Sequence, residues 1–119
     1  MKKILPICCV ALLFATAATA QNRFSAEDFK NNLGKTGTLC DTVGSLRVFS
    51  DTLTLLNMGG VYPNQKYTIA VKGDKIKLPW DKLKGKSICA TGVFEMYKGR
   101  PEIEITDPGR IILGKLPTD

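Results

Sequence analysis

Hydrophobic positions divide the chain into an apolar leader and a longer region of short runs. Residues 4–15 are almost entirely apolar, whereas from Lys35 onward Val, Ile, Leu and Thr recur in short runs separated by glycine and polar clusters. Alternation of apolar and polar positions with a period of two is typical of strands that bury one face. The pattern therefore predicts one small, mainly β domain behind the leader.

The first twenty residues have the organisation of a cleavable secretion signal. Lys2 and Lys3 supply the positive start, residues 4–15 form an apolar run too short to span a bilayer, and residues 18–20 give the Ala-Thr-Ala pattern of a cleavage site. A membrane anchor is the alternative interpretation. We expect a mature chain that begins at about Gln21, is secreted or periplasmic, and contains no further membrane span.

Residues 21–34 are predicted to form a short N-terminal helix. Ser25 is a residue type that caps the first free amides of a helix, and Asp28 stands where a capping box places an acid. A helix this short depends on tertiary packing, so Phe29 and Leu33 are expected to pack on the rest of the domain.

Five strands are predicted in the remainder of the domain. They are residues 36–48, 52–57, 66–72, 87–96 and 102–106, with a final edge piece at residues 111–113 and a tail at residues 114–119. Gly44 is expected to bend or bulge the long first strand. The lysine-rich connection at residues 73–84 has room for a short helix at Pro79, and Trp80 is expected to close the end of the core.

The Lys98-Gly99 turn sets the register of the last hairpin. A two-residue turn pairs Tyr97 with Arg100 and Glu95 with Glu102, which places these four side chains on the outer face. Strands in this order, a helix-bearing connection between the third and the fourth, and a bent first strand fit a five-stranded Greek-key barrel of the OB type over residues 35–113. An open sandwich is the alternative.

Several stretches carry a resemblance to a known group of domains. They are Gly34-Lys35 opening a strand, Leu56-Asn57-Met58-Gly59-Gly60, Tyr62-Pro63-Asn64-Gln65 leading into a Thr-Ile-Ala-Val strand, Gly85-Lys86-Ser87-Ile88-Cys89-Ala90-Thr91-Gly92, and Tyr97-Lys98-Gly99-Arg100-Pro101-Glu102-Ile103. With them, the chain resembles small bacterial OB-fold domains of the nucleic-acid-binding, tRNA-anticodon-domain-like group. The resemblance implies an OB barrel that binds nucleic acid, often single-stranded. The predicted helix before the barrel also resembles exported OB-fold proteins of small-ligand-binding role.

Charge and aromatic residues suggest where such a ligand would bind. The net charge of +6 falls to +4 once the two lysines of the leader are removed, and the lysine-rich stretch at residues 72–86 carries an excess of the same size. Tyr62, Tyr97 and Phe49 are flat side chains on which bases can stack, whereas Tyr67 alternates with Ile69 and is expected in the core. The predicted binding residues are Tyr97, Lys98, Arg100, Lys82, Lys84, Lys86 and Tyr62.

The function is predicted to be binding, not catalysis. The sequence contains no histidine, the commonest general base and metal ligand, and we expect no catalytic residues, metal or cofactor. The predicted partner is single-stranded nucleic acid or another extended anionic polymer. The alternative is a structural module of the cell envelope that binds a protein or small ligand, with lysines that only solubilise it.

Two cysteines lie in the predicted mature chain. Cys40 falls in the first predicted strand and Cys89 in the fourth, and these strands are neighbours in an OB barrel. An even number of cysteines in an exported chain favours a disulfide. Two buried free thiols are the alternative.

Overall fold

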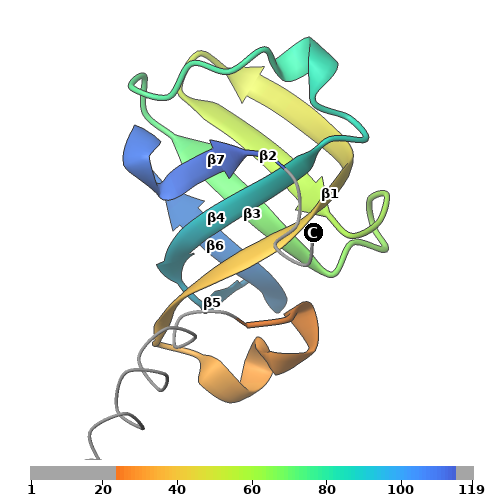
Figure 1. The fold of residues 1–119 in the computed structure, drawn as a ribbon, viewed down its shortest axis with the longest axis vertical. Helices are drawn as coiled ribbons and strands as arrows, with labels where there is room; N and C mark the ends of the chain where they lie inside the picture. The colour runs from red at the N-terminus through yellow and green to blue at the C-terminus, as the bar shows by residue number, and fades with distance from the viewer. Residues whose placement is uncertain (1–23, 115–119) are drawn as a thin grey trace, which may run out of the picture.

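The computed structural model describes residues 24–114, which form a strongly curled, seven-stranded sheet (Figure 1). The strands are β1 (Thr36–Ser50), β2 (Leu53–Met58), β3 (Tyr67–Lys72), β4 (Ser87–Val93), β5 (Glu95–Tyr97), β6 (Arg100–Ile105) and β7 (Ile111–Leu113). Their order in the sheet is β5-β6-β3-β2-β1-β4-β7, and neighbours are antiparallel except for the parallel pair β3 and β6. Contacts between β4 and β6 bring the two ends of the sheet together.

The core fills the inside of this curled sheet. Tyr67, Ile69 and Val71 of β3 are buried, as their alternation predicts, and Leu56 and Met58 of β2 lie in the same cluster. Apolar burial at about 25 cal/mol per Å² is the main force that holds the curved sheet closed. Tyr67 belongs to the core as predicted, and its burial raises the pKa of the phenol, with a smaller contribution from Asp41.

The first strand bends at the predicted glycine. The register between β1 and β2 shifts between Val43 and Ser45, which identifies Gly44 as the irregular position. A Cβ atom at Gly44 would overlap the carbonyl group of Gly60, so the close approach of two backbones leaves room only for glycine there. The bend lets one strand pair with β4 along its first half and with β2 along its second.

The last hairpin has the predicted register, with Glu95 opposite Glu102 and Tyr97 opposite Arg100. The predicted strand at residues 87–96 is interrupted at Phe94, which separates β4 from β5. The Phe94 ring is fully buried between Phe24 and Phe29, with ring centroids 5.3 Å and 4.6 Å away. At the break, the Phe94 amide donates to the Lys35 carbonyl at 3.0 Å, and the Phe94 carbonyl accepts the Gly34 amide at 2.8 Å.

The predicted N-terminal helix is wrong. Two short 3-10 turns, η2 (Ala26–Asp28) and η3 (Lys30–Asn32), take its place. The Ser25 amide does donate to the Asp28 carboxylate, at 3.2 Å. However, the Asn32 side chain donates to the Asp28 carbonyl at 2.7 Å, so it occupies the acceptor that an α-helix would give to the Asn32 amide.

The N-terminal segment is held by two aromatic side chains, Phe29 in the core and Phe24 packed against it. Phe29 is buried as predicted, whereas Leu33 is 45% exposed and does not contribute to the core, contrary to expectation. In the lysine-rich connection, Pro79 precedes a third 3-10 turn, η4 (Trp80–Lys82), and Trp80 is partly buried against the core. A fourth turn, η5 (Pro108–Arg110), leads into β7.

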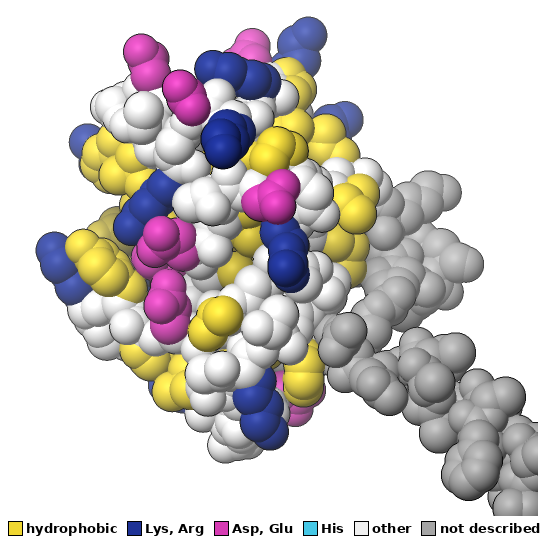
Figure 2. Space-filling view, turned by 90° about the vertical axis from the view of Figure 1, so that its left-hand side faces the viewer, with side chains coloured by type: hydrophobic (Ala, Val, Ile, Leu, Met, Phe, Trp, Pro, Cys, Tyr) yellow, Lys and Arg dark blue, Asp and Glu magenta, His cyan; other side chains and the backbone are white. Residues whose placement is uncertain are grey.

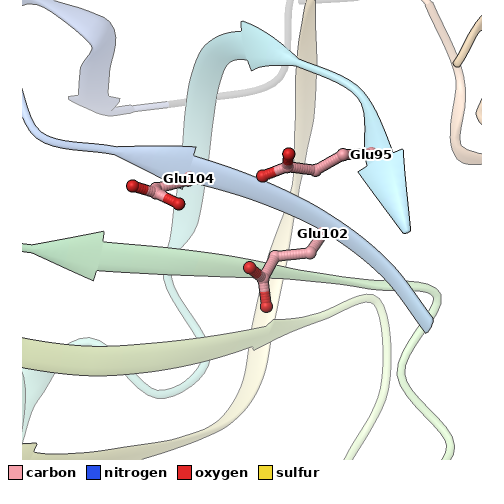
Figure 3. A group of neighbouring side chains, drawn as sticks. All are labelled: Glu95, Glu102 and Glu104. Atoms are coloured by element: carbon pink, nitrogen blue, oxygen red, sulfur yellow. The ribbon is translucent and has the colours of Figure 1, made fainter. Parts of the chain in front are cut away.

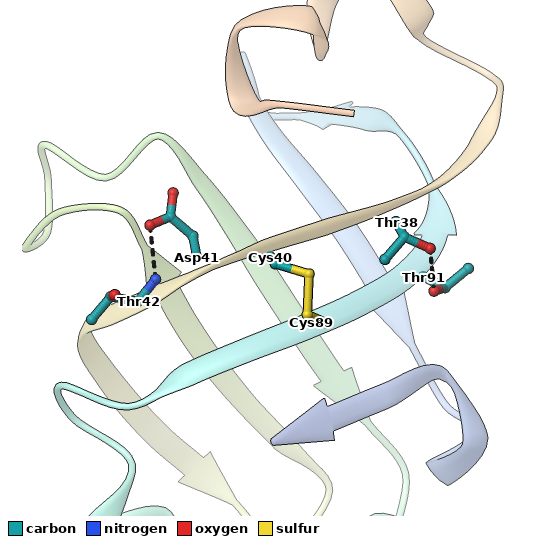
Figure 4. Close-up of a disulfide and its surroundings, with 6 residues drawn as sticks. All are labelled: Thr38, Cys40, Asp41, Thr42, Cys89 and Thr91. Atoms are coloured by element: carbon teal, nitrogen blue, oxygen red, sulfur yellow. Dashed lines mark hydrogen bonds between the residues drawn. A yellow bond between two sulfur atoms is a disulfide. The ribbon is translucent and has the colours of Figure 1, made fainter. Parts of the chain in front are cut away.

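A disulfide joins β1 to β4 (Figure 4). Cys40 lies directly opposite Cys89 in the antiparallel ladder, and their sulfur atoms are 2.04 Å apart. Two residues along each strand, the hydroxyls of Thr38 and Thr91 are hydrogen-bonded at 2.7 Å. The cysteines are thus paired, and the alternative of two free thiols is wrong.

The predicted secretion signal at residues 1–20 and all but the first residue of the predicted tail at residues 114–119 lie outside the described part of the chain. Within residues 24–114 we find no helix that is long and apolar enough to cross a membrane.

Candidate ligand-binding groove

A groove of about 860 Å³ crosses the outer face of the sheet between the loop at residues 59–65 and the β5–β6 hairpin. We call it the ring groove. Its lining residues are Ser45, Leu46, Arg47, Phe49, Leu53, Leu55, Asn57, Val61, Tyr62, Gln65, Thr68, Ala70, Lys72, Tyr97, Lys98, Arg100, Pro101 and Glu102. They come from the second half of β1, from β2 and β3, and from the loop and hairpin on either side.

Three exposed aromatic rings line the ring groove, and each lies beneath a cation. The Arg47 guanidinium is 4.6 Å from the centroid of Phe49, the Arg100 guanidinium 5.3 Å from that of Tyr62, and the Lys98 ammonium 5.4 Å from that of Tyr97. These separations are within the range of cation–π attraction. The rings are 49%, 62% and 52% exposed, in the order Phe49, Tyr62 and Tyr97, so each is accessible to a ligand.

The three pairs have different local causes. Arg47 and Phe49 are two residues apart in β1, so the pleat places both side chains on one face. Lys98 follows Tyr97 in the hairpin turn, where it adopts a positive φ of 52°. Arg100 reaches from β6 to the opposite loop, where its Nη1 donates to the Pro63 carbonyl at 3.4 Å.

Polar side chains of neighbouring strands are hydrogen-bonded across the floor of the ring groove. The Gln65 amide donates to the Thr68 hydroxyl at 3.2 Å, and Thr68 donates to Asn57 at 3.3 Å. Asn57 in turn donates to Ser45 Oγ at 3.0 Å, and Ser45 Oγ also accepts the backbone amide of Tyr62 at 3.0 Å. This chain of bonds ties the loop that carries Tyr62 to the sheet, which limits the movement of the ring.

One wall of the ring groove is acidic. Glu102 lines it, Glu95 lies opposite Glu102, and Glu104 follows two residues later on the same face of β6 (Figure 3). Burial raises the pKa of Glu102; Lys72 counters the rise, and Glu95 and Glu104 add to it. Lys72 donates to Glu104 at 3.2 Å, and this bond raises the pKa of Lys72.

The structure brings together four of the seven predicted binding residues. Tyr62, Tyr97, Lys98 and Arg100 all line the ring groove. Their role in binding a ligand stays a prediction. Sequence reasoning named Phe49 only as an available ring and missed Arg47. The predicted strand ends at residue 48, so the sequence did not predict that Phe49 lies on the same face of a strand as Arg47.

The three other predicted lysines lie elsewhere. Lys82 and Lys86 line a separate hollow of about 560 Å³ together with Pro79, Leu83 and Leu113, and Lys84 lines neither cavity. On the face shown in Figure 2, basic, acidic and hydrophobic side chains are interspersed. The predicted lysines therefore do not extend the ring groove into one continuous basic channel.

Comparison with known proteins shows the fold. No family model matches the sequence, and no curated protein matches it either. Asparaginyl-tRNA synthetase from Entamoeba histolytica, solved with asparaginyl-adenylate, is similar in structure over 81% of this chain and 24% of its own, with a TM-score of 0.58 and 17% identity. Aspartyl-tRNA synthetase from the same organism is similar over 95% and 23%, with a TM-score of 0.56 and 15% identity.

A third similar structure is an OBody bound to hen egg-white lysozyme. It covers 83% of this chain and 99% of its own, with a TM-score of 0.56 and 14% identity. The chain spans about a quarter of the two synthetases it matches. At these identities the likeness concerns the fold alone: the protein is a mainly β domain whose structural neighbours have the OB fold.

Proposed function

We propose that the ring groove binds single-stranded nucleic acid without catalysis. The observation that carries this proposal is the set of three exposed rings in one groove, each with its own cation. Unstacked bases bind to aromatic faces with little dependence on sequence, and Lys and Arg side chains neutralise the phosphates that connect them. Arg47, Lys98 and Arg100 would bind phosphates, while Phe49, Tyr62 and Tyr97 would stack bases.

Two features support binding over chemistry. The sequence contains no histidine. The hydroxyls of Ser45 and Thr68 in the groove floor are hydrogen-bonded to the side-chain amides of Asn57 and Gln65, and within residues 24–114 neither bonds to a side chain that could take up its proton. The side chains of the groove are thus suited to binding a ligand.

The compartment belongs to the same proposal. The Cys40–Cys89 disulfide supports an oxidising location, and the leader predicted at residues 1–20 would deliver the chain there. The likeness to two tRNA synthetases is consistent with a nucleic-acid ligand. At 17% and 15% identity, it is a likeness of fold.

A protein partner at the same groove is the second candidate. The acidic wall around Glu102 would repel phosphates, and the similar OBody binds a protein, lysozyme. Exposed Val61 and Phe49 would suit an apolar contact in such an interface.

Fluorescence anisotropy of a labelled single-stranded oligonucleotide tests the proposal. We expect binding by the mature protein that weakens as salt rises. Tyr97→Ala should weaken it by about 1–3 kcal/mol, or about 5- to 150-fold, because one stacking face is lost. Tyr97→Phe keeps the ring and should bind nearly as well as the unchanged protein.

The matched control is Ile112→Ala. Ile112 is exposed like Tyr97 but lies on β7, away from the ring groove. It should leave binding unchanged. No binding at low salt would overturn the nucleic-acid proposal in favour of the protein partner. Equal losses in Tyr97→Ala and Ile112→Ala would show that the ring groove is not the binding site.

A further inference from the structure

A row of polar side chains crosses the floor of the ring groove from β1 to β6. Ser45 is the register partner of Asn57, and Asn57 is the register partner of Thr68. Thr68 lies beside Glu102 in the parallel pair of β3 and β6. Register partners share one face of a sheet, and all four residues line the groove, so they form one continuous polar row.

Three members of this polar row are buried. Among residues 24–114, the buried polar side chains are those of Thr54, Asn57, Thr68 and Glu102, and the last three belong to the row. Burying a polar group costs free energy unless the group is hydrogen-bonded. Apolar side chains would form this floor without that cost. The row is therefore best explained by a ligand in the groove that pairs with its hydrogen-bonding groups.

The first three members of the polar row bind one another. Thr68 donates its hydroxyl proton to Asn57 and accepts a hydrogen bond from Gln65. Asn57 donates to Ser45. Glu102 ends the row on β6, and within the part of the chain that the structure describes no group donates a hydrogen bond to its carboxylate. The fourth member is thus the one with acceptors left for a ligand.

The carboxylate of Glu102 opens to the ring groove. The fully buried side-chain atoms without a partner in residues 24–114 are Gln65 Oε1 and Tyr67 Oη, so the unpaired oxygens of Glu102 are not fully buried. The nearby ammonium of Lys72 donates to Glu104 at 3.2 Å and lowers the negative charge of this wall without occupying the oxygens of Glu102. Both oxygens of Glu102 are therefore accessible from the groove that they line.

We propose that Glu102 makes the ring groove selective for guanine in a single strand, an inference that rests on the proposed function. An ionised carboxylate only accepts hydrogen bonds, and unstacked bases are recognised on their Watson–Crick edges. Guanine alone has two donors side by side on that edge, N1–H and the N2 amino group, and they match the two carboxylate oxygens. Thymine has one donor between two carbonyl oxygens, which a carboxylate repels.

The rings and the carboxylate would make separate contributions to binding. Aromatic faces such as that of Tyr97 stack any base, whereas Glu102 would distinguish stacked bases by their edges. Arg100 precedes Glu102 by two residues on the same face of β6, about 7 Å along the strand. A cation for the phosphate and an acceptor for the base thus occupy adjacent positions of one strand face.

Anisotropy with labelled oligothymidylates that differ only in one central nucleotide tests the inference. We expect a central guanine to bind about 5- to 150-fold more tightly than a central thymine, the range for one bidentate contact to a base. Hypoxanthine is the matched ligand because it keeps the purine ring and N1–H but lacks the N2 amino group. It should bind about tenfold more weakly than guanine, since one hydrogen bond to a charged acceptor is lost.

Glu102→Gln should abolish the preference for guanine over thymine. The carboxamide has one donor and one acceptor, which suit the N3–H and a carbonyl of thymine. Glu104→Gln is the matched control, because it removes the same charge from the same strand face but does not line the groove. It should leave the ratio of the guanine affinity to the thymine affinity unchanged.

Equal affinity for guanine, hypoxanthine and thymine would overturn this inference and leave the proposed function standing. An equal change of the guanine-to-thymine ratio in Glu102→Gln and Glu104→Gln would also overturn it, because the effect would then come from charge alone. A protein that binds none of the oligonucleotides would overturn the proposed function, and this inference with it.

Discussion

The ring groove and the lysine-rich connection carry similar positive charge but differ in what surrounds it. In the ring groove, Arg47, Lys98 and Arg100 each lie over an aromatic ring contributed by β1, the loop or the hairpin. In the connection, Lys82 and Lys84 are exposed and make no ion pair or ring contact within the described residues. The two regions thus differ in whether a cation lies over an aromatic ring.

The packing of apolar residues explains why the connection is rich in lysine. Ile76 and Leu83 are buried in the core, and lysines flank each of them in sequence at positions 75, 77, 82 and 84. A segment that inserts one apolar residue at a time needs solvated neighbours on either side to keep its backbone at the surface. The lysine run thus marks the outer side of a connection.

The largest expected effect concerns the disulfide, which lies outside the ring groove. Replacing Cys40 and Cys89 by serine opens a loop with a sequence separation of 49 and should lower the free energy of unfolding by about 4 kcal/mol. Urea unfolding measures this loss. Oligonucleotide affinity of the folded variant should not change, and a parallel loss of affinity would show that the groove depends on the β1–β4 pairing.

A pair of lysine substitutions separates the two basic regions directly. Lys98→Ala should reduce the slope of log affinity against log salt by about 0.7, the value for one phosphate contact on a single strand. Lys84→Ala removes the same charge from the connection and should leave that slope as it is. Anisotropy titrations at several salt concentrations give both slopes. Equal changes in the two slopes would mean that the bound oligonucleotide also contacts the connection.

The smallest effect is the pH dependence of stability at the acidic wall. Burial raises the pKa of Glu102, so the folded protein holds this proton more tightly than the unfolded chain. Protonation of Glu102 therefore stabilises the folded state. This stabilisation is fully present below the usual glutamate pKa of 4.5, and it is lost as the pH rises through the raised pKa of Glu102. Glu102→Gln should therefore be more stable than the unchanged protein near pH 7.

The same urea unfolding experiment, repeated across this pH range, checks the prediction. The gap between the two proteins should narrow as the pH falls. A constant gap would show that the carboxylate is solvated in the folded state.

Much of the barrel could be predicted because its signals are local. Alternation at Tyr67 and Ile69 gave the inner face of β3, and the Lys98-Gly99 turn fixed the hairpin register. The N-terminal helix was mispredicted because the cap formed by Ser25 and Asp28 is compatible with the first turn of an α-helix and with a 3-10 turn. The outcome depended on the Asn32 side chain, whose bond to the Asp28 carbonyl is not evident from the cap motif.

The candidate site was only half predictable for a different reason. Tyr97, Lys98 and Arg100 are close in sequence, so their meeting follows from the hairpin. Tyr62 meets Arg100 across a sequence separation of 38, which depends on the parallel pairing of β3 with β6. Such a pairing is non-local, and neither hydrophobic pattern nor turn chemistry specifies it.

The crossing of two backbones at Gly44 and Gly60 also constrains how this barrel can vary over evolution. A methyl group on Gly44 would overlap the Gly60 carbonyl, and one on Gly60 would lie 2.6 Å from the Asn64 carbonyl oxygen. Neither position can therefore accept a larger residue unless the loop at residues 59–65 moves away from β1. A larger residue at either glycine would thus displace the loop that carries Tyr62 and disturb the ring groove from below.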